Sequence, residues 1–121
     1  MKIIRYAIGL MVLLSSIQTL HAQELIIHQR QLHLRHIQGV IVDSTGATVE
    51  YAVVELRDAK DHHVIASTFA DGRGKFAFED KKRRTQWEVR ASLKGFNMVQ
   101  YSLKITRFGD NKMRLVLTPA A

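Results

Sequence analysis

Residues 86–93 read QWEVRASL, and this stretch decides the fold class. Its apolar residues, Trp87, Val89, Ala91 and Leu93, occupy every second position, and polar residues fill the positions between them. Successive side chains of a strand point to opposite faces, so the pattern predicts a strand with one face in a core and the other towards solvent. No stretch after residue 22 has the i, i+3, i+4 apolar spacing of an amphipathic helix. We therefore predict an all-β protein.

The same alternation recurs in both directions from this strand, and turn-forming residues separate the repeats. At two of these turns we expect Gly46 and Gly74 to adopt a positive φ. We also expect the Asp71 side chain to form an Asx-turn, a hydrogen bond to the backbone two residues further on. Short strands at such regular spacing indicate an antiparallel sandwich or barrel. We predict seven strands, at 37–43, 51–58, 64–70, 74–79, 86–93, 97–106 and 111–118. Five aromatic residues should anchor the core: Phe76, Phe78, Trp87, Phe96 and Tyr101.

The composition limits the kinds of protein to consider. The chain has 121 residues, 46% hydrophobic and 24% charged, which are ordinary globular values for one domain. It contains no cysteine, which excludes a disulfide framework, a thiolate zinc site and a cysteine nucleophile. We expect neither a cofactor nor a metal.

The first 22 residues have the layout of a secretory signal peptide. Lys2 and Arg5 precede a short apolar run at 7–14, and a polar stretch then ends in the small residue Ala22. The run is shorter than the roughly 20 residues that span a bilayer, which disfavours the alternative of an uncleaved membrane anchor. Cleavage after Ala22 would leave a net charge of 16 − 11 = +5 on the mature chain. We predict an extracytoplasmic protein, periplasmic or secreted, without stable membrane insertion after cleavage.

Five short motifs follow one another in a specific order. They are GVIVD at 39–43, AVVEL at 52–56, ADGRGKFAF at 70–78, WEVRASLKGF at 87–96 and RLVL at 114–117. Together they resemble the carboxypeptidase regulatory-like domain, over residues 37–118. The resemblance implies a prealbumin-like (transthyretin-like) fold, a seven-stranded antiparallel Greek-key β-sandwich, and a domain that is not an enzyme. The domains expected are then a signal peptide at 1–22, a polar lead segment at 23–36, the sandwich at 37–118 and a tail at 119–121.

Lys81, Lys82, Arg83 and Arg84 form the densest charge in the chain. They stand where the resembling family usually carries a Pro-Gly turn. Four consecutive cations could bind phosphate, anionic lipid headgroups or an acidic polysaccharide. The alternative is a solvated hairpin loop, partly neutralised by Glu79 and Asp80.

Val40, Val42 and Val53 break the alternation, because they are apolar at positions that should face outwards. The outer face of a soluble sandwich is normally polar. These valines therefore predict a covered surface, occupied by a protein partner or by the lead segment around Ile26 and Ile27 folding back. Scattered surface valines are the third interpretation.

The sequence gives little support for hydrolytic or metal chemistry. No Gly-x-Ser-x-Gly motif occurs, and Ser92 and Ser102 fall at outward strand positions without an ordered histidine partner. Most of the acidic residues belong to turns. The remaining candidates are histidines, which could bind a borderline metal but which we interpret as solvated: His28, His33, His36, His62 and His63.

We interpret the chain as an exported, non-catalytic accessory or interaction module of the carboxypeptidase regulatory-like type. The alternative is a carbohydrate-binding-like module that recognises an anionic glycan through Lys81–Arg84. The partner expected is a protein or an anionic cell-envelope polysaccharide. Nucleic acid is not expected, because the signal peptide removes the chain from the cytoplasm.

Overall fold

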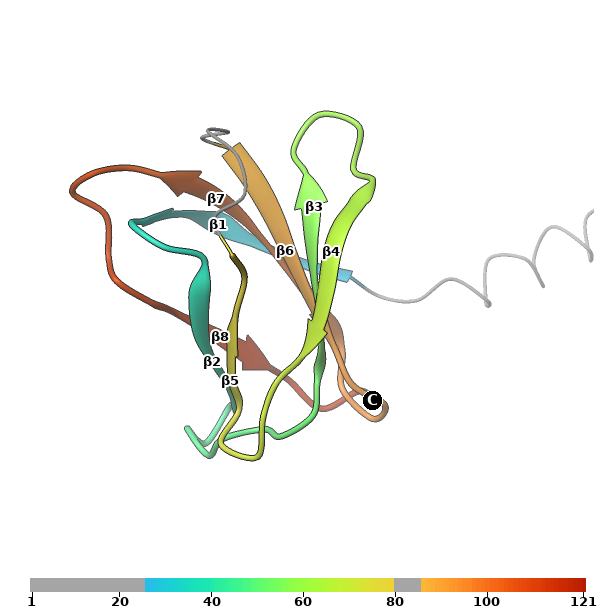
Figure 1. Cartoon of the computed structure of the whole chain (residues 1–121). Coiled ribbons are helices and arrows are strands. Elements are labelled where there is room, and N and C mark those ends of the chain that lie inside the picture. Colours follow the sequence, from blue (N-terminus) through green and yellow to red (C-terminus); the bar gives the residue numbers. More distant parts are fainter. Residues whose placement is uncertain (1–25, 80–85) are drawn as a thin grey trace, which may run out of the picture.

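The computed structural model describes residues 26–79 and 86–121, which form two sheets packed face to face (Figure 1). No helix in the described residues is long and apolar enough to cross a membrane. The strands are β1 (Ile26–Leu34), β2 (Gln38–Asp43), β3 (Val53–Asp58), β4 (Val64–Phe69), β5 (Lys75–Ala77), β6 (Gln86–Ser92), β7 (Met98–Ile105) and β8 (Met113–Leu117).

One sheet has five strands in the order β1-β7-β6-β3-β4, and the other has three in the order β5-β2-β8. β6 lies in the middle of the larger sheet, antiparallel to both β3 and β7. In the smaller sheet β2 is central, antiparallel to β5 and parallel to β8. The all-β prediction is confirmed, and each end of the seven predicted strands lies within two residues of its observed position.

The prediction of seven antiparallel strands is wrong in two respects. The lead segment forms an additional strand, β1, which pairs in parallel with β7, and β2 pairs in parallel with β8. The register of β1 shifts between Gln29 and Leu32, and this irregularity breaks the period-two pattern that would have revealed the strand. The parallel pairings were missed because alternation reports which face a side chain occupies and carries no information about strand direction.

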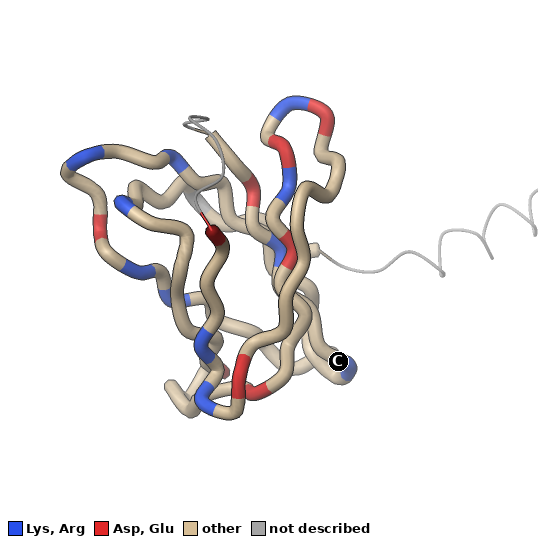
Figure 2. Tube along the Cα trace, in the orientation of Figure 1, with Lys and Arg blue, Asp and Glu red and all other residues tan. Residues whose placement is uncertain are grey.

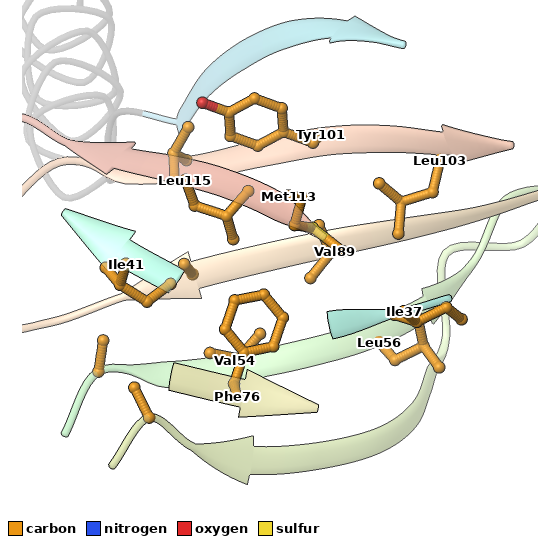
Figure 3. Packing of buried hydrophobic residues seen from close by; sticks show 14 of the residues in the cluster. Ile37, Ile41, Val54, Leu56, Phe76, Val89, Tyr101, Leu103, Met113 and Leu115 are labelled. Atoms are coloured by element: carbon orange, nitrogen blue, oxygen red, sulfur yellow. The ribbon is translucent and has the colours of Figure 1, made fainter. Parts of the chain in front are cut away.

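The core lies between the two sheets, and every strand of the described chain contributes to it except β4 at its edge (Figure 3). Of the five predicted aromatic anchors, Phe76, Trp87 and Tyr101 are buried, whereas Phe78 and Phe96 are half-buried against the cluster. Aliphatic side chains fill the remainder. The fully buried ones are Leu34, Ile41, Val54, Val89, Val99, Leu103, Leu115 and Leu117.

The turn between β4 and β5 has the predicted geometry. Gly74 has a φ of 74°, and a Cβ at this position would meet the Ile41 carbonyl oxygen at 2.7 Å. The Asp71 carboxylate accepts hydrogen bonds from the backbone N–H groups of Lys75 and Arg73, at 2.9 and 2.8 Å. These bonds favour the charged form, so they lower the pKa of Asp71 below its usual value. The turn is therefore set both by a glycine and by an ionised carboxylate.

The burial of Trp87 predicts how much its truncation lowers the free energy of unfolding. Trp87→Ala should lower the free energy of unfolding by about 3–5 kcal/mol, because it opens a cavity between the sheets. Phe108→Ala is the matched control: Phe108 is 92% exposed, so its loss should change stability by less than about 0.5 kcal/mol. Urea denaturation followed by circular dichroism measures both. Similar losses for the two variants would contradict the assignment of Trp87 to the core.

Candidate functional site

The structure separates the three valines that the sequence grouped as a partner surface. Val40 and Val42 lie on β2 in the smaller sheet, whereas Val53 lies on β3 in the larger one. Their side chains point to the outer faces of opposite sheets, so they cannot form one patch. Val42 is also buried, at 4% exposure. The lead segment does not cover Val40 and Val42, because β1 joins β7 in the other sheet.

Other predicted site residues lie outside the described chain or in separate places. Lys81, Lys82, Arg83 and Arg84 fall outside the described residues, so the anionic-ligand site they were predicted to form stays a prediction. The histidines do not converge: His28 and His33 are exposed on β1, and His36 is exposed just after it. His62 and His63 lie in the loop between β3 and β4.

The β3–β4 loop brings Asp58, Asp61 and His63 together, with one potential ligand atom from each within 4.8 Å of the others. Turn hydrogen bonds account for this arrangement. Asp58 Oδ1 accepts from Lys60 N at 2.7 Å, and Asp61 Oδ1 accepts from His63 N at 3.1 Å. A further contact with the His63 ring is the main cause of a lowered pKa at Asp61. The cluster is therefore a pair of Asx-turns.

A buried polar network lies on the outer face of the larger sheet, and sequence reasoning missed it. Glu88 on β6 and Gln100 on β7 are only 5% and 8% exposed. Glu88 Oε2 accepts a hydrogen bond from the Gln100 side chain, and Glu88 Oε1 contacts His62 Nδ1. Gln100 Oε1 in turn accepts from Arg90 Nε and Nη2, at 3.0 and 2.7 Å. The side-chain nitrogen and oxygen of Gln100 are thus both hydrogen-bonded, and both carboxylate oxygens of Glu88 have a partner.

This network links β6, β7 and the β3–β4 loop. Ser102 stands directly opposite Glu88 on β7, but no hydrogen bond joins Ser102 to His62 in the described chain. His62 reaches Glu88 from the β3–β4 side, whereas Ser102 lies on the β7 side. A nucleophile–base pair requires the serine hydroxyl within hydrogen-bond reach of the imidazole. The contacts of Glu88 instead tie together β6, β7 and the β3–β4 loop.

The edge strand β4 is the most exposed strand of the larger sheet. Its sequence VIASTF contains no charge, glycine or proline. Val64, Ile65 and Phe69 are 44%, 40% and 68% exposed, and β3 is the only strand with which β4 pairs in the described chain. Proteins usually protect such edges with charges, proline or bulges. The β3–β4 pairing has one irregularity, a register shift at Ile65 between the pairs Leu56–Ala66 and Arg57–Val64. Residues 66–69 of β4 pair regularly and carry none of these protections, so this part of the edge can accept another strand.

Comparison with known proteins agrees with this architecture. Residues 36–118 match the family model of the carboxypeptidase regulatory-like domain. The chain belongs to the carboxypeptidase regulatory-like domain family. No curated protein matches the chain.

Two solved structures resemble this regulatory-like domain in fold. A 5-hydroxyisourate hydrolase from Klebsiella pneumoniae matches with a TM-score of 0.55 and 19% identity, over 71% of this chain and 91% of that one. A catechol 1,2-dioxygenase variant from Acinetobacter radioresistens matches with a TM-score of 0.51 and 11% identity, over 83% of this chain and 60% of that one. At these identities the likeness concerns the fold alone, which is transthyretin-like.

The polar network of the regulatory-like domain should contribute measurably to stability. Gln100→Ala removes a hydrogen-bond donor from the buried Glu88 carboxylate and an acceptor from Arg90, so it should cost about 1–3 kcal/mol. Ser102→Ala is the control, because Ser102 is exposed on the same face of the same strand. It should cost less than about 0.5 kcal/mol. Urea titrations monitored by Trp87 fluorescence compare the two. A Gln100 variant as stable as the Ser102 variant would show that the network adds nothing.

Proposed function

We propose that this domain is a non-catalytic interaction module of an exported protein, and that a protein partner docks by adding an extended strand to β4. The observation that carries the proposal is the uncharged, exposed edge of β4. Strand addition at an open sheet edge is a general mode of peptide recognition, in which main-chain hydrogen bonds give affinity and side-chain pockets give specificity.

The backbone of β4 is oriented for such pairing. Ala70 N–H donates to Ala52 O, just beyond the end of the β3–β4 ladder. Hydrogen-bonding direction alternates along an antiparallel strand, so Thr68 also faces β3. The N–H and C=O groups of Ser67 and Phe69 consequently point to the open edge. These groups are the ones that an added strand would use.

A cleft of about 310 Å³ next to β4 provides the side-chain pocket. It opens between the edge strands of the two sheets, β4 and β5. Apolar side chains from both sheets line it, among them Leu56, Ile65, Phe78 and Trp87. A strand added to β4 directs every second side chain towards this side of the sheet. An apolar side chain at that position could enter the cleft.

These features define the partner chemically. Its docking segment is extended and uncharged at its centre, with large apolar side chains at alternate positions. A second copy of this chain fits less well, because the regularly paired part of its own β4, residues 66–69, would present only the small side chains of Ala66 and Thr68 to the cleft. The mature chain is also basic, at 16 − 11 = +5, so two copies repel one another. The same net charge would attract an acidic partner to the domain as a whole.

A model peptide tests this mode of docking. The probe is a synthetic peptide in which leucine alternates with threonine, and its control has the same composition with the leucines grouped together. Trp87 is the only tryptophan of the chain and lines the cleft, so its fluorescence should change saturably with the alternating peptide. The grouped peptide should give a response at least about tenfold weaker, because it cannot fill the cleft while pairing.

Two substitutions at one position complete this test. Ser67→Pro removes an outward N–H and should weaken peptide binding about tenfold, at a position where an edge strand tolerates proline. Ser67→Thr keeps the N–H and should bind as the original chain does. Equal binding by both variants, or equal responses to both peptides, would contradict strand addition at β4. Concentration-dependent sedimentation of the protein without peptide would indicate self-pairing as the occupant instead.

The export part of the proposal has its own test. Export is supported by positions 1–22, where basic residues come first, an apolar run follows and a small residue ends the segment. Mass spectrometry of the extracytoplasmic fraction of the native host should find a chain that begins at Gln23 or within a few residues of it. A chain that retains Met1 there, or that is confined to the cytoplasm, would overturn export.

A further inference from the structure

We propose that the loop between β7 and β8 is a peripheral docking site for an anionic lipid surface, with Phe108 as its apolar anchor. The loop comprises residues 106–112 and projects from the left side of the sandwich in Figure 1. Phe108 is 92% exposed, more than any other large hydrophobic residue of the described chain. An aromatic ring in this position either remains in water or enters an apolar phase.

The loop holds Phe108 at its tip in a fixed conformation. Gly109 N–H donates to Thr106 O at 3.3 Å, which closes a four-residue turn with Arg107 and Phe108 at its centre. The base of the loop is bonded to the end of β1. Thr106 N–H donates to Leu34 O at 2.8 Å, and Asp110 N–H donates to His33 O at 3.0 Å.

Gly109 shows how closely the loop approaches β1. A Cβ at this position would lie 2.4 Å from the carbonyl carbon of Leu34. Arg35 N–H also donates to Asp110 O at 2.7 Å. These contacts fix the base of the loop, so docking need not order its backbone there.

Cations surround this tip. We define the basic tip as Arg35, Arg107, Phe108 and Lys112. Figure 2 shows the positively charged positions gathered along this loop and the neighbouring end of the β1–β2 connection. Between residues 98 and 121 the sequence contains one acidic residue, Asp110, and four basic residues. None of the three basic-tip cations takes part in a salt bridge within the described chain.

This combination favours a lipid surface over a polysaccharide. The ring protrudes as a projection with no polar atom of its own, so it suits insertion between headgroups. A sugar-binding site normally needs hydrogen-bonding groups around a platform. Each cation near an anionic bilayer strengthens attachment about fivefold, and the effect fades within about 8 Å at physiological salt. The site would give reversible, salt-labile attachment.

The experiment uses residues 23–121, which contain all eight strands and the core of the described fold. Removing 1–22 also prevents that apolar run from binding lipid by itself. The probe is a vesicle of phosphatidylcholine with about one third phosphatidylglycerol, compared with phosphatidylcholine alone. Sedimentation with vesicles at about 0.1 M and 1 M salt should show binding only to the anionic vesicles at low salt.

Matched variants then locate the contact. Phe108→Ala should weaken vesicle binding about tenfold. The double change Arg107→Gln with Lys112→Gln should weaken it roughly tenfold to thirtyfold. The control, Arg73→Gln with Lys94→Gln, removes the same charge from two exposed turns, β4–β5 and β6–β7, of which the second lies at the other end of β7 from the β7–β8 loop. It should change binding less than about twofold.

Insertion of the ring has a direct optical test. Phe108→Trp should show blue-shifted emission with anionic vesicles and quenching by brominated lipid. The buried Trp87 of the unmodified chain should show neither. Equal effects of the two double variants, or vesicle binding that is unchanged in Phe108→Ala, would overturn the proposal. Salt-labile binding to polygalacturonate as tight as to vesicles would overturn it in favour of a polysaccharide.

Discussion

The burial of β6 on both of its faces is the constraint on which the rest of the structure depends. Its inward residues, Trp87, Val89 and Ala91, lie in the core, and its outward Glu88 is nearly as inaccessible. A buried carboxylate is costly unless donors surround it. Gln100 and His62 supply these contacts, so the polar network fixes the register of β7 and the position of the β3–β4 loop. His62 has a φ of 64°, a conformation that non-glycine residues rarely adopt, and its contact with Glu88 offsets that cost.

The strands that the sequence predicted are those with an unbroken alternation of apolar and polar residues. β1 was missed because a register irregularity interrupts its pattern, and its histidines and glutamines resemble a linker. Glu88 was placed correctly on the outward face of its strand, but outward was equated with solvent-exposed. In a central strand, long neighbouring side chains cover that face. The burial depends on which strands are neighbours, and a single sequence does not contain that information.

The same limitation applies to the proposed docking edge. VIASTF is recognisable as a strand from its β-branched residues, yet nothing in it distinguishes an edge strand from a central one. The topology makes the distinction. β1 pairs with β7 and covers that side of the larger sheet, which leaves β4 as its uncharged open edge. β1 is the other edge strand of this sheet, and its sequence carries histidines and Arg30 where β4 has only uncharged residues.

The distribution of charge sets the uncharged open edge of β4 apart from the rest of the domain. An edge such as β4 promotes pairing between copies, and natural proteins usually place a charge within the strand to prevent it. Here the excess positive charge lies elsewhere, much of it around the β7–β8 loop (Figure 2). The net charge of +7 on the whole chain weakly opposes the close approach of two copies, whichever surfaces they present. It therefore opposes self-pairing without blocking the backbone groups of β4. In the proposed strand addition, a partner of opposite charge would meet no such barrier, so the open edge would favour a foreign strand over a second copy.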